Sequence, residues 1–223
     1  MKRWAILVAI LYSAMLGILS APFSMLAFVP NVDLKNAVEI YGHWQWWLWL
    51  VVMGLAQAAL LLVPVRVASR RPVTRLPLAL TIVAGGLMMG ALVTGGVYSL
   101  CEFAFAQHAL EKPEGDWTQW FAPGLGLAEW CVWAVIFFRS SRTMEPLDLV
   151  SRQCKWLLKG SILELLVAVP THIVARCRDY CCAGLMTFIG LVLGTSVMLF
   201  SFGPGVFFLF VARWRRLHPG AGE

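Results

Sequence analysis

Residues 44–65, WQWWLWLVVMGLAQAALLLVPV, form an apolar run that contains no charged side chain. A helix needs about 20 such residues to cross the ~30 Å hydrocarbon core of a bilayer. The tryptophans at the start of the run are typical of the aromatic belt at a membrane–water interface. The stretch therefore predicts a transmembrane helix whose first turn lies at the level of the lipid headgroups.

The composition of the whole chain indicates the same class of protein. Of its 223 residues, 60% are hydrophobic and 13% are charged, and the mean hydropathy is +0.74. A soluble domain carries about a quarter charged residues, and at this length it has too little interior for so much apolar surface. Segments of alternating polarity are absent from the sequence, so we predict an all-α bundle in which residues 1–223 form a single membrane domain.

Six apolar runs are long enough to be transmembrane helices. They cover residues 4–28, 44–65, 78–105, 119–138, 158–175 and 182–212. The first follows a basic start like that of a signal peptide, but its length and the proline after Ser20-Ala21 favour an uncleaved helix. The run 158–175 is the shortest, and Pro204 predicts a kink in the last run.

The basic residues indicate how these helices are oriented. Fourteen of the 18 Lys and Arg residues lie before the first run, between the second and third, between the fourth and fifth, or after the sixth. The positive-inside rule places these connections in the cytoplasm. We therefore predict a multi-pass protein of the inner (plasma) membrane, with six crossings and both termini in the cytoplasm.

The connection between the fourth and fifth runs has the periodicity of a helix. Its apolar residues recur at spacings of three and four, and its basic residues occupy other positions: Leu147, Val150, Cys154, Leu157 and Leu158 against Arg152, Lys155 and Lys159. This pattern predicts a separate amphipathic helix on the cytoplasmic leaflet, before the helix 158–175. Its basic side would face anionic headgroups.

The net charge of +6 does not indicate a nucleic-acid partner, because the basic residues form short clusters rather than a continuous stripe. The partner predicted first is the lipid bilayer. Two pairs of glycines one helical turn apart, Gly86 with Gly90 and Gly190 with Gly194, predict close helix packing within the bundle. The same pairs leave open contacts with other membrane subunits or with a second copy of the chain.

A polar segment, PTHIVARCRDYCCAG at residues 170–184, lies between the last two apolar runs. In the predicted topology it lies at the non-cytoplasmic end of the bundle, close to the ends of the runs 44–65 and 78–105. Six potential metal ligands meet there: His43, His108, His172, Cys177, Cys181 and Cys182. Thiolates and imidazoles suit a copper or zinc ion, and a helix continuing through residue 181 would place Cys177 and Cys181 one turn apart. A haem held by His43 and His172 is the other cofactor that these residues leave open.

The cysteines also permit a disulfide. On an oxidising side of the membrane, Cys177 or Cys181 would pair with Cys101 if the helices adjoin. The alternative is that the cysteines are small apolar residues without redox chemistry. Arg176 and Arg178 oppose the charge bias, so we predict that they bind an anionic substrate, a lipid phosphate, or the acidic residues of the segment 111–116.

Three acidic residues fall within apolar runs: Glu102, Glu129 and Glu164. A carboxyl group in hydrocarbon is costly and usually faces the interior of the bundle. By their positions in the predicted helices they form an outer, a middle and an inner member of a series, which predicts a proton or cation path. The alternative is that each is protonated and hydrogen-bonded to a neighbouring helix.

Taken together, the sequence predicts a small membrane protein that handles a metal ion or thiols, in ion transport or in membrane redox chemistry. The alternative is an accessory or scaffold subunit of a larger membrane complex that performs no chemistry itself. No nucleotide motif or catalytic set occurs in the sequence, so we assign no catalytic residues.

Overall fold

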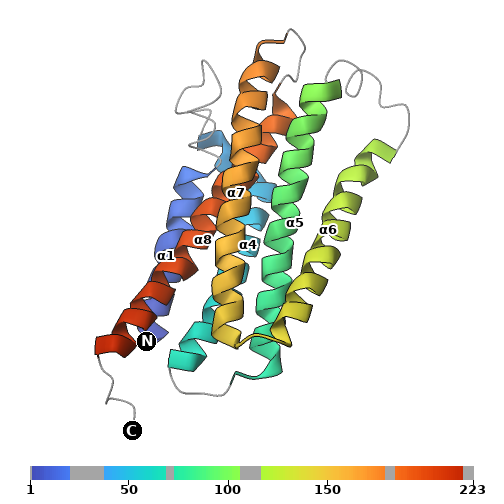
Figure 1. The fold of residues 1–223 in the computed structure, drawn as a ribbon. Helices are drawn as coiled ribbons and strands as arrows, with labels where there is room; N and C mark the ends of the chain where they lie inside the picture. The colour runs from blue at the N-terminus through green and yellow to red at the C-terminus, as the bar shows by residue number, and fades with distance from the viewer. Residues whose placement is uncertain (1, 21–37, 69–72, 106–116, 179–183, 218–223) are drawn as a thin grey trace.

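The computed structural model of the chain describes residues 2–20, 38–68, 73–105, 117–178 and 184–217, which form a bundle of helices (Figure 1). The α-helices that lie within these described ranges are α1 (Lys2–Leu19), α4 (Trp44–Ala68), α5 (Arg75–Phe105), α6 (Trp117–Ser141), α7 (Pro146–Arg176) and α8 (Leu185–Leu217). A short 3-10 helix, η1 (Ile40–Gly42), precedes α4. The described residues contain no strand, so the prediction of an all-helical chain is confirmed for them.

Four segments of these helices are long and apolar enough to cross a membrane. They are Trp44–Val67, Arg75–Ala104, Pro146–Arg176 and Leu185–Phe207, and the apolar part of α1, Trp4–Leu19, is shorter. Large apolar side chains cover the outward faces, among them Leu55 on α4, Leu163 on α7 and Leu209 on α8. Apolar surface of this extent is expected where helices contact lipid tails rather than water.

Helix α5 occupies the centre of the bundle, since it packs against α4, α6, α7 and α8. Helix α1 lies at the edge and packs on α4 and α8. The main core is built from apolar side chains of several helices, including Leu60, Met88, Leu157 and Phe200. Because α5 contacts four helices, polar residues on it can contribute to sites that those helices share.

The glycine pair on α5 allows α6 to approach closely. A Cβ atom on Gly86 would lie 3.0 Å from the backbone nitrogen of Ala134, and one on Gly90 would lie 3.1 Å from that of Trp130. These separations are tighter than a Cβ atom normally has, so a side chain at either position would require α6 to shift by a few tenths of an ångström. The predicted close packing at this pair is therefore confirmed, and it occurs within the bundle.

The predicted amphipathic helix on the membrane surface is wrong. Helix α7 runs without a break for 31 residues, from Pro146 to Arg176. Its first turns do not lie apart from the bundle, because Leu149, Val150 and Leu157 belong to the main core. These apolar positions continue the same buried face as Ala168 and Ala175 further along the helix, so one continuous helix buries both sets.

The other predicted boundaries agree better with the structure. The runs 44–65, 78–105 and 119–138 lie within α4, α5 and α6, and the run 182–212 corresponds to α8. Of the run 4–28, the first part is α1, and residues 21–28 lie outside the described part of the chain. Pro204 lies inside α8, which continues past it.

Candidate functional site

Glu102, near the end of α5, binds the beginning of α8. Its side chain is only 2% exposed. The backbone N–H groups of Gly184 and Thr187 each donate to its carboxyl group, at 2.6 Å. The first N–H groups of a helix have no partner within the helix and carry partial positive charge, so an acceptor is stabilising there. Glu102 therefore links α5 to α8 through a helix cap.

His172, in the last turns of α7, belongs to the same junction. It is 1% exposed, and its Nδ1 lies 2.8 Å from Oγ1 of Thr187. The hydroxyl group of Thr187 donates its one hydrogen to the carbonyl of Gly184, at 3.0 Å. His172 and Thr187 therefore connect the end of α7 to the first turn of α8. We define Glu102, His172, Arg178, Gly184 and Thr187 as the outer junction.

Arg178 has a partner that the sequence did not reveal. Its guanidinium group donates to the backbone carbonyls of Glu102, at 3.0 Å, and Phe103, at 2.8 Å. These carbonyls belong to the last turn of α5, where a cation is favoured. Arg178 thus caps the end of α5, which supplies a reason for a basic residue on this side. Its predicted role in binding an anion stays a prediction.

Arg176 and Gly184 are in contact where the chain turns into α8. Gly184 has φ +89°, a conformation that residues with a side chain rarely adopt. A Cβ atom there would lie 2.6 Å from Cδ of Arg176. The aliphatic part of Arg176 therefore covers Gly184. The predicted pairing of the two arginines with the acidic segment 111–116 lies outside the described residues.

The structure describes only some of the predicted metal ligands. His172 is buried, Cys177 is exposed and donates to the carbonyl of Ile173 at 3.4 Å, and His43 is exposed before α4. The other predicted ligands, His108, Cys181 and Cys182, lie outside the described residues. Among the described residues, no group of three or more His, Cys, Asp or Glu side chains is arranged to hold a metal ion.

Helix α7 ends at Arg176 with Cys177 as its cap residue, so it does not continue through residue 181 as the predicted pairing of Cys177 with Cys181 requires, and Cys181 itself lies outside the described residues. The cysteines described by the structure, Cys101, Cys131, Cys154 and Cys177, are free thiols, so Cys101 is not bonded to Cys177. A copper or zinc ion, a haem, and a disulfide that involves Cys181 stay predictions.

Glu164, within α7, occupies a different kind of environment from Glu102. It is 6% exposed, and neither carboxyl oxygen has a hydrogen-bond partner among the described residues. The surrounding surface is formed by glycines of two other helices. A Cβ atom on Gly95 of α5 would lie 3.1 Å from Oε1, and a Cβ atom on Gly194 of α8 would overlap Oε2. The carboxyl group therefore fits between three helices only because these positions lack side chains.

The buried face of α7 carries further polar residues on both sides of Glu164. Gln153 and Ser161 lie toward the beginning of the helix, and Thr171 and His172 lie toward its end. All four are buried. We call Gln153, Ser161, Glu164, Thr171 and His172 the polar column of α7. Gln153 donates to the carbonyl of Thr81 on α5 at 3.3 Å, and its Oε1 has no partner among the described residues.

The order of the three acidic residues along the bundle differs from the prediction. Positions along α5 give the level of each residue in the bundle. Glu164 faces Gly95 of α5, and Glu129 lies next to Trp130, which packs on Gly90 of α5. Along α5, Gly95 is nearer than Gly90 to Glu102. Glu164 therefore lies nearer to Glu102 than Glu129 does, and Glu129 is half-buried on α6. The reason is the early start of α7 at Pro146, which moves Glu164 away from the end where α7 begins. Whether the three form a path stays a prediction.

Several residues of the site were not recognised in the sequence. The sequence pattern places Gln153 in the predicted surface helix and Ser161 in the short run 158–175. Their spacing from Glu164 and His172 does follow one helical face, and a search for buried polar periodicity along 146–176 would have found them. Gly95 carries no signal of its own, because its role depends on the position of Glu164 in another helix.

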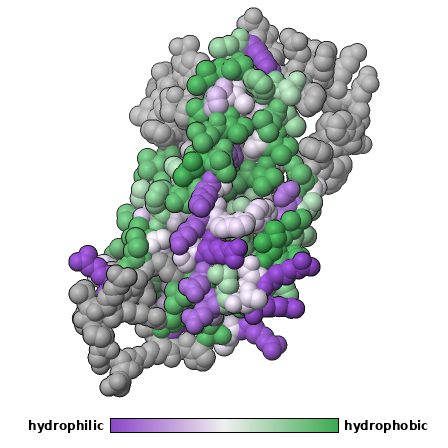
Figure 2. Space-filling model, in the orientation of Figure 1, coloured by the Kyte–Doolittle hydropathy of each residue, from purple (hydrophilic) through white to green (hydrophobic). Residues whose placement is uncertain are grey.

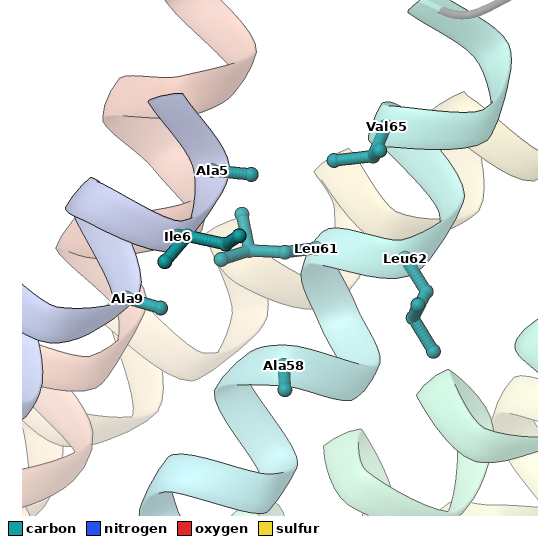
Figure 3. A pocket seen from close by; sticks show the side chains of 7 residues that line it. All are labelled: Ala5, Ile6, Ala9, Ala58, Leu61, Leu62 and Val65. Carbon is teal, nitrogen blue, oxygen red and sulfur yellow. The ribbon is translucent and has the colours of Figure 1, made fainter. Parts of the chain in front are cut away.

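An apolar groove of about 280 Å³ lies between α1 and α4 (Figure 3). It is lined by Ala5, Ile6, Ala9, Ala58, Leu61, Leu62 and Val65. These side chains contain no polar atom, so the groove offers nothing for ionic or catalytic chemistry.

Comparison with models of protein families, with curated proteins and with solved structures gave no match to this chain.

Proposed function

We propose that this chain is a multi-pass membrane protein that carries protons, or small monovalent cations in their place, across the bilayer on Glu164. The observation that supports this most strongly is the unpaired, buried carboxyl group between α5, α7 and α8. A buried polar group without a partner costs about 1–3 kcal/mol. Ionisable groups inside a membrane protein are rare and usually mark a pathway for ions or protons.

The proposal includes the topology predicted from the sequence. Six crossings with both termini in the cytoplasm agree with the arrangement in Figure 1, where α1 begins and α8 ends at the same end of the bundle. Arg66, Arg75, Arg139 and Arg142 lie at the ends of helices that meet there. The membrane would be the inner (plasma) membrane, and basic residues would mark its cytoplasmic face.

The polar column supports a route to Glu164 from both sides. Ser161 and Gln153 would lead toward the cytoplasm, and Thr171 and His172 toward the opposite face. In one cycle, Glu164 takes a proton from one side and releases it to the other, so one proton crosses and the carboxyl group returns to its first state. The glycines around it leave room for the carboxyl group between α5 and α8, because Gly95 and Gly194 have no side chains at this level.

The metal- or thiol-handling function predicted from the sequence is less well supported. The buried His172 contacts Thr187, and the thiol of Cys177 is exposed at the end of α7. The contact with Thr187 therefore explains the buried His172 without a metal ion. The outer junction would instead hold α5, α7 and α8 in register above Glu164.

The test is ion flux into sealed vesicles that contain the purified chain and a trapped pH-sensitive dye. An imposed pH gradient or membrane potential should drive proton entry faster than into protein-free vesicles, and Glu164→Gln should abolish this difference. The amide is close to the carboxyl group in size, so the variant should fold. Glu145→Gln is the matched control, since it makes the same chemical change at an exposed position just before α7.

Two results would overturn the proposal. The first is a wild-type chain that carries neither protons nor sodium nor potassium ions above the background of empty vesicles. The second is a Glu164→Gln variant that carries the ion as fast as the wild type. The first result would favour the alternative of an accessory or scaffold subunit.

A further inference from the structure

A second groove, of about 450 Å³, lies between α7 and α8, toward the end of the bundle that is opposite to the outer junction. Its walls are mainly apolar and include Leu158 of α7 and Phe202, Val206 and Leu209 of α8. Lys155 and Ser151 add polar atoms to its lining. The volume falls in the range of pockets that bind small molecules, about 300–1,000 Å³. The groove therefore combines a long apolar wall with one cationic group.

The apolar wall is open to the surroundings of the bundle. Phe202 and Val206 are exposed, and Leu209 is exposed by 73%. An apolar occupant would remove this surface from contact with water or with mobile lipid tails. The occupant must also reach Lys155, so a purely apolar molecule would leave part of the site unused.

The cationic part of the groove extends along α7. Arg152, Lys155 and Lys159 are exposed on this helix, and neither lysine has an ion-pair partner among the described residues. The guanidinium group of Arg152 lies 5.4 Å from the ring centre of Trp156, within the range of a cation–π interaction. Figure 2 shows a hydrophilic band over α7, bordered by hydrophobic surface on either side.

This band is unusual for its position along the bundle. Gln153, two residues before Lys155, contacts Thr81 of α5, inside the helix that begins at Arg75. The adjacent helix α6 exposes Val132 and Val135 on its outer face. The cations of α7 therefore lie beside apolar helix faces rather than beyond the ends of the helices. Long basic side chains in such places reach toward the headgroups and pair with anions there.

From these observations we infer that the groove between α7 and α8 binds one anionic phospholipid of the surrounding bilayer. The lipid phosphate lies on Lys155, and an acyl chain lies along Leu158, Phe202 and Val206. The two parts of the ligand match the two parts of the groove, and charge complementarity selects an anionic headgroup over a zwitterionic one. The inference stands independently of ion transport by Glu164.

The test is native mass spectrometry of the purified full-length chain, released from micelles that contain dioleoyl phosphatidylglycerol or dioleoyl phosphatidylcholine. One phosphatidylglycerol molecule should remain bound in preference to phosphatidylcholine. Lys155→Gln should weaken its retention about tenfold, the loss expected for one hydrogen bond to a charged group. Arg139→Gln, which removes an exposed cation from α6 at the same end of the bundle, is the matched control and should retain the lipid.

Two further measurements separate a lipid site from a simple anion site. Val206→Trp fills part of the apolar groove with a larger side chain and leaves Lys155 in place, so it should also release the lipid. Glycerol phosphate, which has the anionic group without acyl chains, should fail to displace it.

Equal retention of the two lipids by the wild type would overturn the inference. So would equal effects of Lys155→Gln and Arg139→Gln, or displacement of the lipid by glycerol phosphate. Retention of an acidic protein at this face, with no preference between the lipids, would also contradict it.

Discussion

The contact of Glu102 with the beginning of α8 makes a quantitative prediction about stability. Glu102→Ala removes the acceptor for the N–H groups of Gly184 and Thr187, which Glu102 binds at 2.6 Å each. Each buried donor that loses its partner costs about 1–3 kcal/mol. The free energy of unfolding should therefore fall by about 2–6 kcal/mol, toward the lower end if water fills the vacated space.

Glu102→Gln should have a smaller effect, because the amide oxygen still accepts one hydrogen bond while its NH2 group faces the other donor. The assay is equilibrium unfolding of the purified chain in mixed micelles, followed by far-UV circular dichroism. Glu129→Ala is the control and should change stability by about 0.5 kcal/mol or less, as is usual away from such contacts. A Glu102→Ala chain within about 0.5 kcal/mol of the wild type would refute the helix cap.

Two more substitutions test the contacts around the site. Gly194→Ala should destabilise the bundle by about 1–3 kcal/mol in the same unfolding assay, because its methyl group would overlap the carboxyl group of Glu164. The control is Gly124→Ala, since a Cβ atom at Gly124 would have no neighbour within 4 Å. Equal effects of the two substitutions on the free energy of unfolding would contradict the packing at Gly194. Arg178→Ala should lower the free energy of unfolding by about 1–3 kcal/mol, because it removes two hydrogen bonds to the end of α5. Arg142→Ala is the control and should leave the free energy of unfolding unchanged. An Arg178→Ala chain as stable as the wild type would show that the cap contributes nothing to stability.

Local sequence signals were sufficient for most of the helices. Residues 44–65 are uncharged and have clear polar or basic flanks, so the predicted run differs from α4 only by its last residues. Helix α7 was misjudged because its exposed face carries Lys155 and Lys159, which made its first half resemble a surface helix. The buried face of that half is nevertheless apolar and belongs to the core.

The contacts of the site were harder to predict than the helices. Glu102 and Arg178 were both recognised as unusual, but their partners are backbone groups at the ends of other helices. Backbone groups carry no sequence signal, and which helix ends meet depends on the register of α5, α7 and α8. The glycines opposite Glu164 could be suspected of close packing, while their position beside a carboxyl group follows only from the assembled bundle.

The most direct test of Glu164 as the carrier is the time course of its reaction with a lipophilic carbodiimide in transport-active vesicles. This reagent reacts with carboxyl groups that are protonated in apolar surroundings, and peptide mass spectrometry locates each modified residue. We predict that Glu164 is modified and that ion flux is lost in proportion to its modification. Loss of flux without modification of Glu164, or full flux after Glu164 is completely modified, would contradict the proposed function.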